Sequence, residues 1–379
     1  MTDSVPRRTL FIAFYTASPP TGGASAVTFH LARHWPGERK LVQIGDRPGI
    51  CEAAPGLQVE TLAYRGQGER WQKLAKVPGW IAQMAAIAAT YRPGMIILEG
   101  ASWCAYHWCL MKVLRQRVPD ATLIYHAHNV EYDLRRQKHN WVIAELTRWF
   151  ERRVLAGADI ATSVSPADAN RFCSLYGRKT VSLPNGVDAA WLQSVSPQTV
   201  ETVRVRYALT PETVLFMGAY AYRPNREAID FLVNAVFPAL IRKKPQARLL
   251  ILGGPVPYER PWLIAPGLVL SGDLPGFIRA AAVSVAPIFS GSGTRLKILE
   301  SLAAGVPVIS TAKGIEGLPL EPGSDFLPAE TAETFVDALL KVFDADVSVS
   351  TSTTAKMAAL HWPAVIRTFL SETALWQNS

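Results

Sequence analysis

The stretch Val283–Leu318, VSVAPIFSGSGTRLKILESLAAGVPVISTAKGIEGL, decides the fold because it predicts a strand, a loop, a helix and a second strand without a break. An apolar run with β-branched members is followed by the small residues of 289–293, whose backbone can approach a ligand closely. Apolar residues then recur at helical spacing from Thr294, and Gly305 stands where a C-terminal cap belongs. Residues 306–310 form the next buried strand, so the unit is βαβ and predicts a parallel sheet.

The start of the expected helix is a candidate site for a diphosphate. A helix N-terminus presents unpaired N–H groups and partial positive charge, here at Gly293, Thr294 and Arg295. The side chains of Arg295 and Lys297 add charge, and Glu300, expected two turns into the helix, could accept two hydrogen bonds from a ribose diol. The alternative is an ordinary glycine-rich turn followed by a solvated helix face.

This motif resembles the signature of glycosyltransferase family 4, whose members are retaining nucleotide-sugar transferases. The resemblance covers nearly the whole chain and places it with a branch that reads GSGTRLKILE. In that family one glutamate lies at the transferred sugar and a second lies at the nucleotide ribose. Glu300 matches the second, whereas Ser292, eight positions earlier, stands where the first is expected. The group that holds the donor sugar therefore differs in this chain.

The resemblance implies the GT-B fold, an α/β architecture of two facing Rossmann-like domains with a central cleft. It assigns residues 1–186 to acceptor binding, residues 187–361 to nucleotide-sugar binding, and residues 362–379 to a helix that crosses back to the first domain. The implied reaction moves a sugar from a nucleotide diphosphate to a hydroxyl of a glycan or lipid-linked acceptor. Retention of configuration and no required metal or other cofactor are part of the same expectation.

Two glycines near the start of the chain belong to this expected site. Gly22 and Gly23 follow the predicted strand Thr9–Tyr15 and permit the backbone to approach a ligand. The resemblance places such a pair beside the donor phosphates and the acceptor. A plain tight turn is the alternative.

A polar cluster follows the predicted strand Ala121–Tyr125, and ligand sites in open α/β sheets gather at such strand ends. The resemblance assigns His128 to the catalytic position near the transferred sugar. His126, Asn129 and Glu131 are expected on the acceptor side, with His126 pointing away from His128. A metal pair is disfavoured because no third ligand is evident nearby.

The second half of the chain carries further donor contacts. Gly218 ends a predicted strand, and in the family an Arg directly after this glycine and a Lys several residues on grip the diphosphate. Ala219 and Asn225 occupy those places here. We therefore expect the two cations of the glycine-rich motif, together with Arg223, to supply the missing charge, although Arg223 also suits a surface position.

Two weaker donor assignments come later in the sequence. Leu268–Pro275 is expected to end a strand at a loop that, in relatives, touches the nucleotide base, so Asp273 and Leu274 are assigned there. Glu316, in a loop after the next strand, is a candidate substitute for the carboxylate missing at Ser292. A turn stabilised by glycines is the alternative for that loop.

Composition agrees with a globular enzyme of two domains. The chain has 379 residues, 49% of them hydrophobic, which is enough for two separate cores. Its four cysteines form no CxxC pair, which argues against a disulfide scaffold or a zinc site and favours a reducing cytosol. The start shows no secretory pattern, and Glu99 and His107 interrupt the apolar stretch Met95–Leu114, so we expect a buried strand and helix there.

The positive charge is concentrated in the first half of the chain. Residues 1–190 hold 23 Lys and Arg against 15 Asp and Glu, whereas the remainder holds 16 of each. The densest part, Leu134–Arg153, interleaves arginines with tryptophans and suits anionic lipid headgroups at the inner membrane face. A core-packed amphipathic helix with a solvated basic side is the alternative. We find no motif that indicates nucleic-acid binding.

Other function classes stay open at this level. A sugar phosphorylase or a nucleotide-sugar epimerase would share the architecture. A non-catalytic subunit that binds a nucleotide sugar is the third class, because the replacements at Ser292, Ala219 and Asn225 remove expected ligand contacts. The acceptor, if the chain is a transferase, is expected in bacterial surface polysaccharide or glycolipid assembly.

Overall fold

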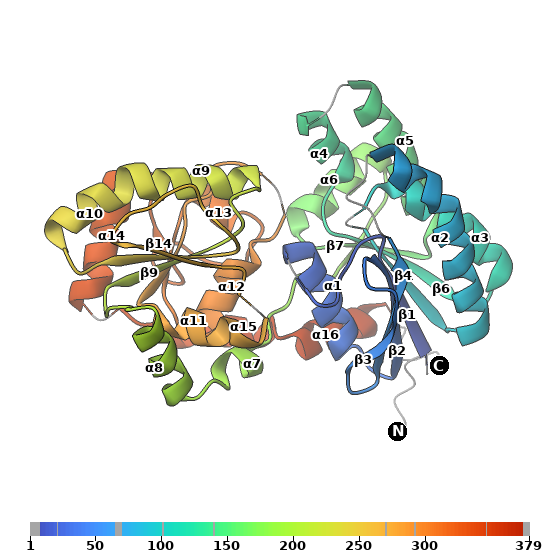
Figure 1. Ribbon diagram of the computed structural model, residues 1–379. Helices are drawn as coiled ribbons and strands as arrows, with labels where there is room; N and C mark the ends of the chain where they lie inside the picture. Colours follow the sequence, from blue (N-terminus) through green and yellow to red (C-terminus); the bar gives the residue numbers. More distant parts are fainter. Residues whose placement is uncertain are drawn as a thin grey trace. The chain divides into compact units, whose positions relative to one another are not determined.

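The computed structural model describes residues 8–20, 22–64, 70–100, 102–138, 141–269, 271–291, 293–345 and 347–373. The chain divides into two compact units, residues 1–185 with 362–379 and residues 186–361, each with its own sheet (Figure 1). Both sheets are mainly parallel with helices between their strands. The predicted α/β class is therefore confirmed.

The first unit contains an eight-stranded sheet of order β3-β4-β2-β1-β5-β6-β7-β8. Its strands are β1 (Arg8–Ile12), β2 (Glu38–Gly45), β3 (Gly49–Ala54), β4 (Leu57–Ala63), β5 (Met95–Glu99), β6 (Thr122–Ala127), β7 (Ile160–Ser163) and β8 (Val181–Ser182). All neighbours are parallel except β3 and β4. Because β2 and β5 lie on opposite sides of β1, the chain reverses direction across the sheet there. The carboxyl ends of β1 and β5 mark the point where ligands bind in doubly wound folds.

Helices of the first unit surround this sheet. They are α1 (Gly23–His34), α2 (Arg70–Tyr91), α3 (Cys104–Arg117), α4 (Glu131–Lys138), α5 (Trp141–Gly157), α6 (Pro166–Tyr176) and α16 (Trp362–Glu372). The last helix packs on α1, where Trp362 stacks on His30 at 6.4 Å and Phe369 lies 6.0 Å from Trp35, measured between ring centroids. The expected return of the C-terminal helix to the first domain is confirmed.

The second unit contains a six-stranded sheet of order β11-β10-β9-β12-β13-β14, in which every pair is parallel. Its strands are β9 (Thr213–Met217), β10 (Arg248–Leu252), β11 (Leu263–Gly267), β12 (Val283–Ala286), β13 (Val308–Ser310) and β14 (Leu327–Pro328). This order matches the dinucleotide-binding arrangement of a Rossmann sheet. Its reversal point lies between β9 and β12, directly before the glycine-rich loop.

Helices cover the second sheet as well. They are α7 (Ala189–Gln193), α8 (Pro197–Arg206), α9 (Arg223–Phe231), α10 (Phe237–Lys243), α11 (Leu274–Ala280), α12 (Leu296–Ala303), α13 (Ala312–Ile315), α14 (Ala332–Ala345) and α15 (Thr351–Ala359). A π-helical turn, Leu232–Val236, joins α9 to α10. Strands β9, β10, β12 and β13 are buried along their lengths except at Arg248, as expected for a parallel sheet covered on both faces.

Several element boundaries differ from those predicted. Helix α12 begins at Leu296 because Arg295 has non-helical angles (φ −86°, ψ 80°), so Glu300 lies one turn into the helix and not two. The segment Leu268–Pro275 is expected to end a strand, but β11, the edge strand of this sheet, already ends at Gly267, directly after Pro266, which has no N–H for the ladder. Helix α9 starts at Arg223, where Pro224 fits the first helical turn.

Candidate functional site

Lys297 is the centre of a polar cluster in the second unit. Its ammonium donates a hydrogen bond of 2.9 Å to Oδ1 of Asn225 and lies 4.3 Å from the centroid of the buried Phe216 ring. Asn225 also donates through Nδ2 to the carbonyl of Ala219, at 3.2 Å. Asn225 therefore connects the turn after β9 to the first turn of α12, although family members are expected to carry a lysine in its place.

Gly218 is required at the end of β9. Its φ of +154° disfavours residues with a side chain, and a Cβ built there would lie 2.5 Å from Nδ2 of Asn225. Any larger residue would displace the amide that binds Lys297. The glycine therefore sets the geometry of the cluster around Lys297.

The two ionisable groups of α12 have strongly shifted acidities. Burial and the neighbouring Arg295 lower the pKa of Lys297 to about 7, against the opposing effect of Glu300. Burial raises the pKa of Glu300 to about 7, while Lys297 acts in the other direction. A bound anion next to Lys297 would favour its protonated form. The pair is therefore poised to respond to a negatively charged ligand.

Arg295 is held by its own loop. Its guanidinium donates to the carbonyl of Gly291 at 3.2 Å and to the carbonyl of Gly293. Only 9% of the residue is exposed, and burial lowers the pKa of this guanidinium. Arg295 thus shapes the loop backbone and places its positive charge at the mouth of α12.

The loop is also fixed from α9. Ser290 donates to Glu227 at 2.5 Å, and Glu227 accepts a second bond from Nε of Arg223 at 2.7 Å. The Arg223 side chain is 77% exposed. Arg223, predicted to contact the diphosphate, is therefore paired with Glu227 at the surface of α9.

The other predicted donor residues occupy varied positions. Glu316 is exposed and pairs with Lys313 at 2.5 Å. Asp273 is exposed just before α11, whereas Leu274 packs partly against the core. Gly293 and Thr294 are half-buried beside Arg295. Ser292 lies outside the described residues.

Glu99 organises the site of the first unit, and the sequence analysis missed it. It ends β5, is fully buried, and its Oε2 accepts from Thr28 at 2.8 Å, His126 Nδ1 at 3.2 Å and His128 Nε2 at 2.8 Å. Burial by itself raises the pKa of Glu99, but the two imidazoles outweigh it and hold that pKa well below its usual range. A charged residue that ends an otherwise apolar strand was the signal in the sequence.

The two histidines lie together, so the expectation that His126 points away from His128 is wrong. Their ring centroids are 4.7 Å apart and both bind the same oxygen. Residues two apart share one face of a strand, and His128 already lies past the end of β6. The cluster extends through Thr28 to the hydroxyl of Tyr15, 2.7 Å away.

Glu99, His126 and His128 also have the composition of a metal site, because their ligand atoms lie within 4.8 Å of one another. Ligands on a tetrahedral zinc ion with bonds of about 2.1 Å are about 3.4 Å apart. The 2.8 Å between Glu99 and His128 is instead the length of an N–H···O hydrogen bond. The geometry therefore favours a hydrogen-bonded carboxylate.

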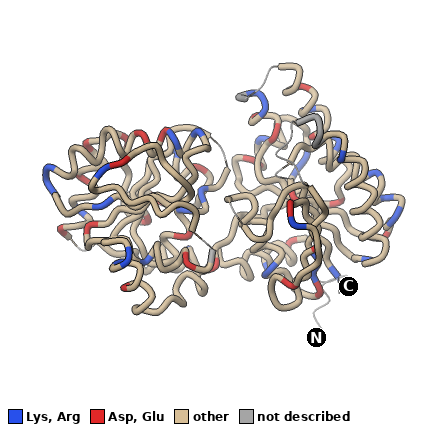
Figure 2. Tube along the Cα trace, viewed as in Figure 1, with Lys and Arg blue, Asp and Glu red and all other residues tan. Residues whose placement is uncertain are grey.

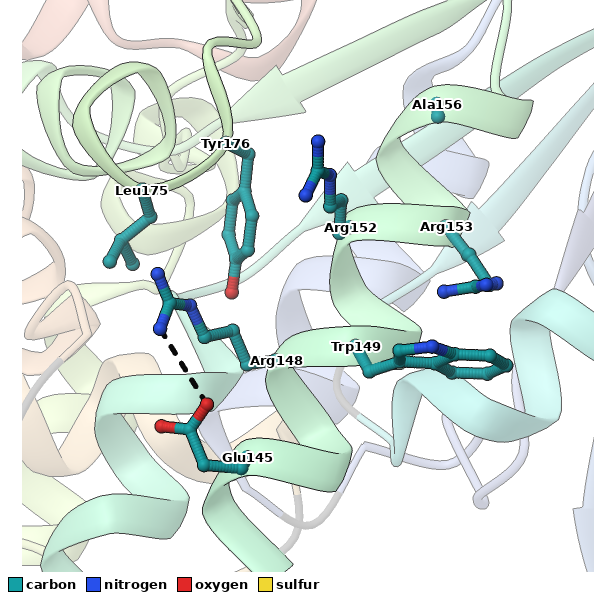
Figure 3. A pocket seen from close by; sticks show the side chains of 8 residues that line it. All are labelled: Glu145, Arg148, Trp149, Arg152, Arg153, Ala156, Leu175 and Tyr176. Atoms are coloured by element: carbon teal, nitrogen blue, oxygen red, sulfur yellow. Dashed lines mark ion pairs between the residues drawn. The ribbon is translucent and has the colours of Figure 1, made fainter.

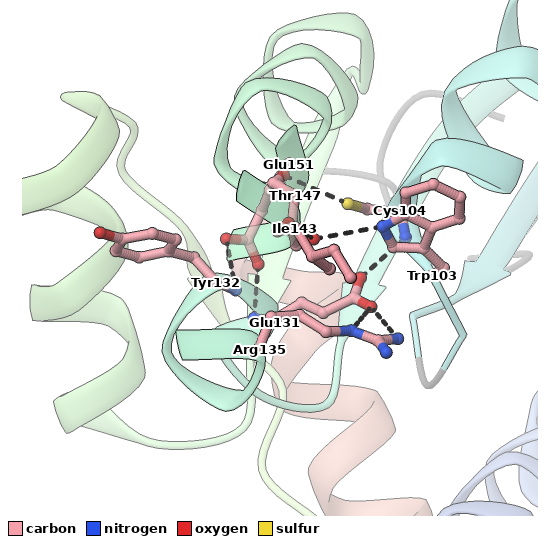
Figure 4. Close-up of polar contacts among 8 residues, drawn as sticks. All are labelled: Trp103, Cys104, Glu131, Tyr132, Arg135, Ile143, Thr147 and Glu151. Carbon is pink, nitrogen blue, oxygen red and sulfur yellow. Dashed lines mark hydrogen bonds and ion pairs between the residues drawn. The ribbon is translucent and has the colours of Figure 1, made fainter. Parts of the chain in front are cut away.

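Glu131 forms hydrogen bonds within the first unit that hold its helices in place (Figure 4). Its carboxylate accepts from the backbone N–H of Cys104 at 2.7 Å and from Nη2 of Arg135 at 2.8 Å. The buried carboxylate of Glu151 accepts from the N–H groups of Glu131 and Tyr132, at 2.6 and 3.2 Å. These two glutamates satisfy the first N–H groups of α3 and α4.

The three remaining predicted site residues of the first unit, Gly22, Gly23 and Asn129, lie at the start of α1 and just after β6. Gly22 caps α1 and exchanges two hydrogen bonds of 2.8 Å with Ser25. A Cβ at Gly22 or Gly23 would meet no atom within 4 Å, so both glycines face open space. Asn129 is partly buried in the bend after β6.

A separate pocket of about 730 Å³ lies between α5 and α6. Arg148 and Arg152 point toward Tyr176, and the guanidinium of Arg153 lies over the Trp149 ring, 3.2 Å from its centroid (Figure 3). Next to it, α5 exposes Trp141 (76%), Val142, Ile143, Leu146 (44%) and Trp149 (42%). The opposite face of α5 packs on the core through Ala144, Val154 and Leu155, as the alternative of a core-packed amphipathic helix expects, but the tryptophans lie on the exposed side. Figure 2 marks the Lys and Arg positions along the chain.

The chain resembles known proteins along both units. The model described as Glycosyltransferase Family 4 matches residues 21–191, and the model described as Glycosyl transferases group 1 matches residues 211–345. The chain belongs to the group 1 glycosyltransferases of family 4. The expected resemblance to glycosyltransferase family 4 is confirmed.

Two curated relatives are similar to part of this chain. It is 29% identical over 194 residues to the GDP-mannose-dependent alpha-(1-6)-phosphatidylinositol monomannoside mannosyltransferase of Mycobacterium tuberculosis, covering 46% of this chain and 49% of the relative. The protein of the same description from Mycolicibacterium smegmatis is 28% identical over 193 residues, covering 46% and 50%. The chain spans about half the length of the curated relatives it matches.

Solved structures establish the GT-B fold of this glycosyltransferase. Sucrose-phosphate synthase from Thermosynechococcus elongatus superposes with a TM-score of 0.76 at 17% identity, over 97% of this chain and 98% of that one. Anabaena HepE in complex with UDP-glucose gives 0.73 at 15% identity, over 97% and 99%. Within the described residues, no helix is both long and apolar enough to span a membrane.

Proposed function

We propose that this glycosyltransferase moves a sugar from a nucleotide-diphosphate donor to an acceptor hydroxyl, with retention of anomeric configuration. The observation that carries the proposal is the bond between Lys297 and Asn225, made at the reversal point of a sheet with Rossmann strand order. A partly buried cation therefore lies where such sheets bind nucleotides. Departure of the sugar leaves negative charge on the diphosphate, and Lys297 would stabilise it.

The ribose and the diphosphate bind along α12 in this proposal. Lys297 and Glu300 lie three positions apart, so they are neighbours on one side of the helix. Arg295 holds the loop carbonyls and adds charge at the helix start. Glu300 accepts hydrogen bonds from the ribose diol, and Lys297 contacts the phosphates.

The transfer needs no metal ion in this proposal. Divalent metals assist nucleotide-sugar chemistry by neutralising the diphosphate, and the described part of this chain provides that charge through Lys297 and Arg295. The loss expected on removing one such donor is on the order of 3 kcal/mol in the activation free energy. Activity retained in a chelator would agree with this assignment.

The acceptor side is formed by the first unit, with His128 at the transferred sugar. Of the two histidines, 7% of the His128 side chain and 1% of the His126 side chain are exposed. His128 is therefore the member of the cluster that a ligand can reach. The open glycines Gly22 and Gly23 lie at the start of α1, the helix that also carries Thr28 of the same cluster.

The acceptor is a lipid-linked or membrane-surface glycan in this proposal, and the exposed face of α5 docks on anionic lipid. Trp141 and Trp149 carry large aromatic rings of the kind that enter the headgroup region. The arginines on the same helix contribute about 1 kcal/mol each near an anionic surface. The curated mycobacterial relatives are described as acting on a phosphatidylinositol glycoside, which agrees with a lipid acceptor.

A thermal-shift screen against UDP-, GDP-, ADP- and dTDP-sugars tests the proposal. A ligand that binds only the folded protein raises the free energy of unfolding, by about 2.7 kcal/mol at a hundredfold excess over Kd. The melting temperature rises with it. The donor found in this way is then incubated with lipid-linked acceptors, and NMR of the product determines the anomeric configuration. Inversion of configuration, or binding without transfer across a broad acceptor panel, would overturn the assignment.

A further inference from the structure

The fully buried carboxylate of Glu99 has no lysine or arginine partner among the described residues. Its Oε2 accepts three hydrogen bonds, whereas its Oε1 is buried without a partner. Burying a carboxylate in this way is costly, and a glutamine or an apolar side chain would fill the same space at lower cost. A retained charge of this kind indicates a role other than packing.

An ionised carboxylate can only accept hydrogen bonds, so each ring nitrogen that binds Glu99 must carry a hydrogen. This assigns a proton to Nε2 of His128 and to Nδ1 of His126. Burial lowers the pKa of His128 more than Glu99 raises it, which favours the neutral ring. In a neutral imidazole the second nitrogen is an acceptor, so Nδ1 of His128 is free to accept a hydrogen bond.

We propose that Glu99 is a positioning residue for sugar transfer, holding His128 in the tautomer whose Nδ1 accepts a hydrogen bond from a sugar hydroxyl. This deepens the proposed function and rests on it. The same relation, in which a carboxylate selects the tautomer of a histidine, orients histidines in metal and protease sites. Glu99 acts through His128 and does not touch the substrate.

The surroundings of His128 support a fixed ring. Among the described residues, the titratable groups that interact with it are Glu99 from β5, His126 from β6 and His107 from α3. Tyr15, from the loop after β1, reaches Glu99 through Thr28. Nε2 of His107 donates to the backbone carbonyl of Glu99, at 3.0 Å, which anchors that residue from a second direction. The ring therefore has one strong partner, the carboxylate.

Histidine tautomers are read directly by NMR of the full chain labelled with ¹⁵N-histidine, with His128→Asn used to assign the signal. Wild-type protein is expected to show His128 protonated on Nε2 alone near neutral pH. Protonation on Nδ1, or a fast mixture of both forms, would overturn the proposal without any variant or donor. This readout is independent of activity, so it separates failure of the proposal from failure of the proposed function.

Glu99→Gln tests the effect on transfer. We expect the tautomer to be held less strongly and the His128 pKa to fall, because the negative charge that raises it is gone, and kcat to fall at least about tenfold with the donor KM changed less than about twofold. Glu151→Gln is the matched control, because it also removes a buried carboxylate that accepts three hydrogen bonds in the same unit. It should leave the His128 spectrum and kcat unchanged.

A double-mutant cycle asks whether Glu99 acts through His128. If it does, Glu99→Gln combined with His128→Asn loses no more activity than His128→Asn alone. The proposal would be overturned if the activity losses of the two single variants multiplied in the double variant, or if the His128 spectrum were unchanged in Glu99→Gln. Elemental analysis that finds one equivalent of zinc or iron, released by His126→Asn, would also overturn it, because the ring nitrogens would then bind the metal.

Discussion

Lys297 donates a hydrogen bond of 2.9 Å to Asn225, and the two residues lie 72 positions apart in the sequence. Asn225 lies in the first turn of α9, the helix that follows β9, while Lys297 lies in the first turn of α12, the helix that follows β12. These two strands flank the reversal point of the second sheet. The bond therefore joins the two loops that surround the expected diphosphate.

Lys297→Met should abolish most of the turnover with little effect on folding. The variant removes the cation that would stabilise the leaving diphosphate, so we expect kcat/KM to fall about 10²- to 10³-fold. The melting temperature should stay equal or rise, because a partly buried ammonium is removed. Lys341→Met, at an exposed position of α14, is the control and should behave as wild type. Wild-type turnover in Lys297→Met would contradict the assignment.

Glu300→Gln should weaken nucleotide binding through the ribose. A hydrogen bond to a charged group contributes about 1.5–3 kcal/mol, so Kd for UDP or GDP should rise about 10- to 100-fold in calorimetry. The 2′-deoxynucleotide should lose much less affinity in the variant, because one partner is already missing. Equal losses for the ribo- and deoxynucleotides would place Glu300 away from the ribose.

Donor affinity should have a maximum near pH 7. Lys297, with a pKa lowered to about 7, loses its charge above this pH and binds the diphosphate less well. Glu300, with a pKa raised to about 7, gains a proton below this pH and accepts the ribose less well. Calorimetric titrations of UDP or GDP across the pH range should therefore give a bell-shaped profile, and Lys297→Met should flatten its alkaline side. A flat wild-type profile would count against both assignments.

Glu151→Ala should destabilise the first unit. The carboxylate accepts from the N–H groups of Glu131 and Tyr132 and from the hydroxyl of Tyr176 at 2.5 Å, so its loss leaves buried donors without partners. We expect the free energy of unfolding in urea to fall by about 2–4 kcal/mol. Glu145→Ala, whose side chain is 49% exposed, should change it by less than about 0.5 kcal/mol.

The stability effect of Glu151 should also depend on pH. Burial raises its pKa to about 7, above the value of an unfolded chain, so the folded state holds the extra proton. The contribution of this residue is full below the unfolded pKa and is lost as the pH rises through about 7. The difference between wild type and Glu151→Gln in urea melts should therefore shift in favour of the variant between mildly acidic and neutral pH. An unchanged difference would show that Glu151 keeps its ordinary acidity.

Binding to anionic vesicles should require the exposed face of α5. Trp141→Ser combined with Trp149→Ser removes the two exposed tryptophans, and co-sedimentation with phosphatidylglycerol vesicles should drop at least about tenfold. Val205→Ser, which removes a 74% exposed apolar residue of the second unit, is the control. Wild-type binding should also weaken with salt, because part of it is electrostatic. Equal binding by the double variant would leave α5 without this role.

Patterns local in the sequence predicted the fold well. The βαβ pattern of Val283–Leu318 and the apolar strands before it indicated two doubly wound domains, since periodicity and turn residues act over a few positions. The strands at the edges of the two sheets were harder to predict. Strand β3 (Gly49–Ala54) is mostly exposed and lacks alternation, and β11 carries a proline, so neither had a clear apolar signal.

The residue types of the site were largely readable from the sequence, but their partners were not. Lys297, Glu300 and His128 stand next to recognisable turns, so the sequence by itself determined which residues are candidates for the site. Only the tertiary structure decided that Asn225 binds Lys297 and that Glu99 binds His126 and His128. These contacts join residues brought together by neighbouring parallel strands, and the separation in sequence leaves no local trace of them.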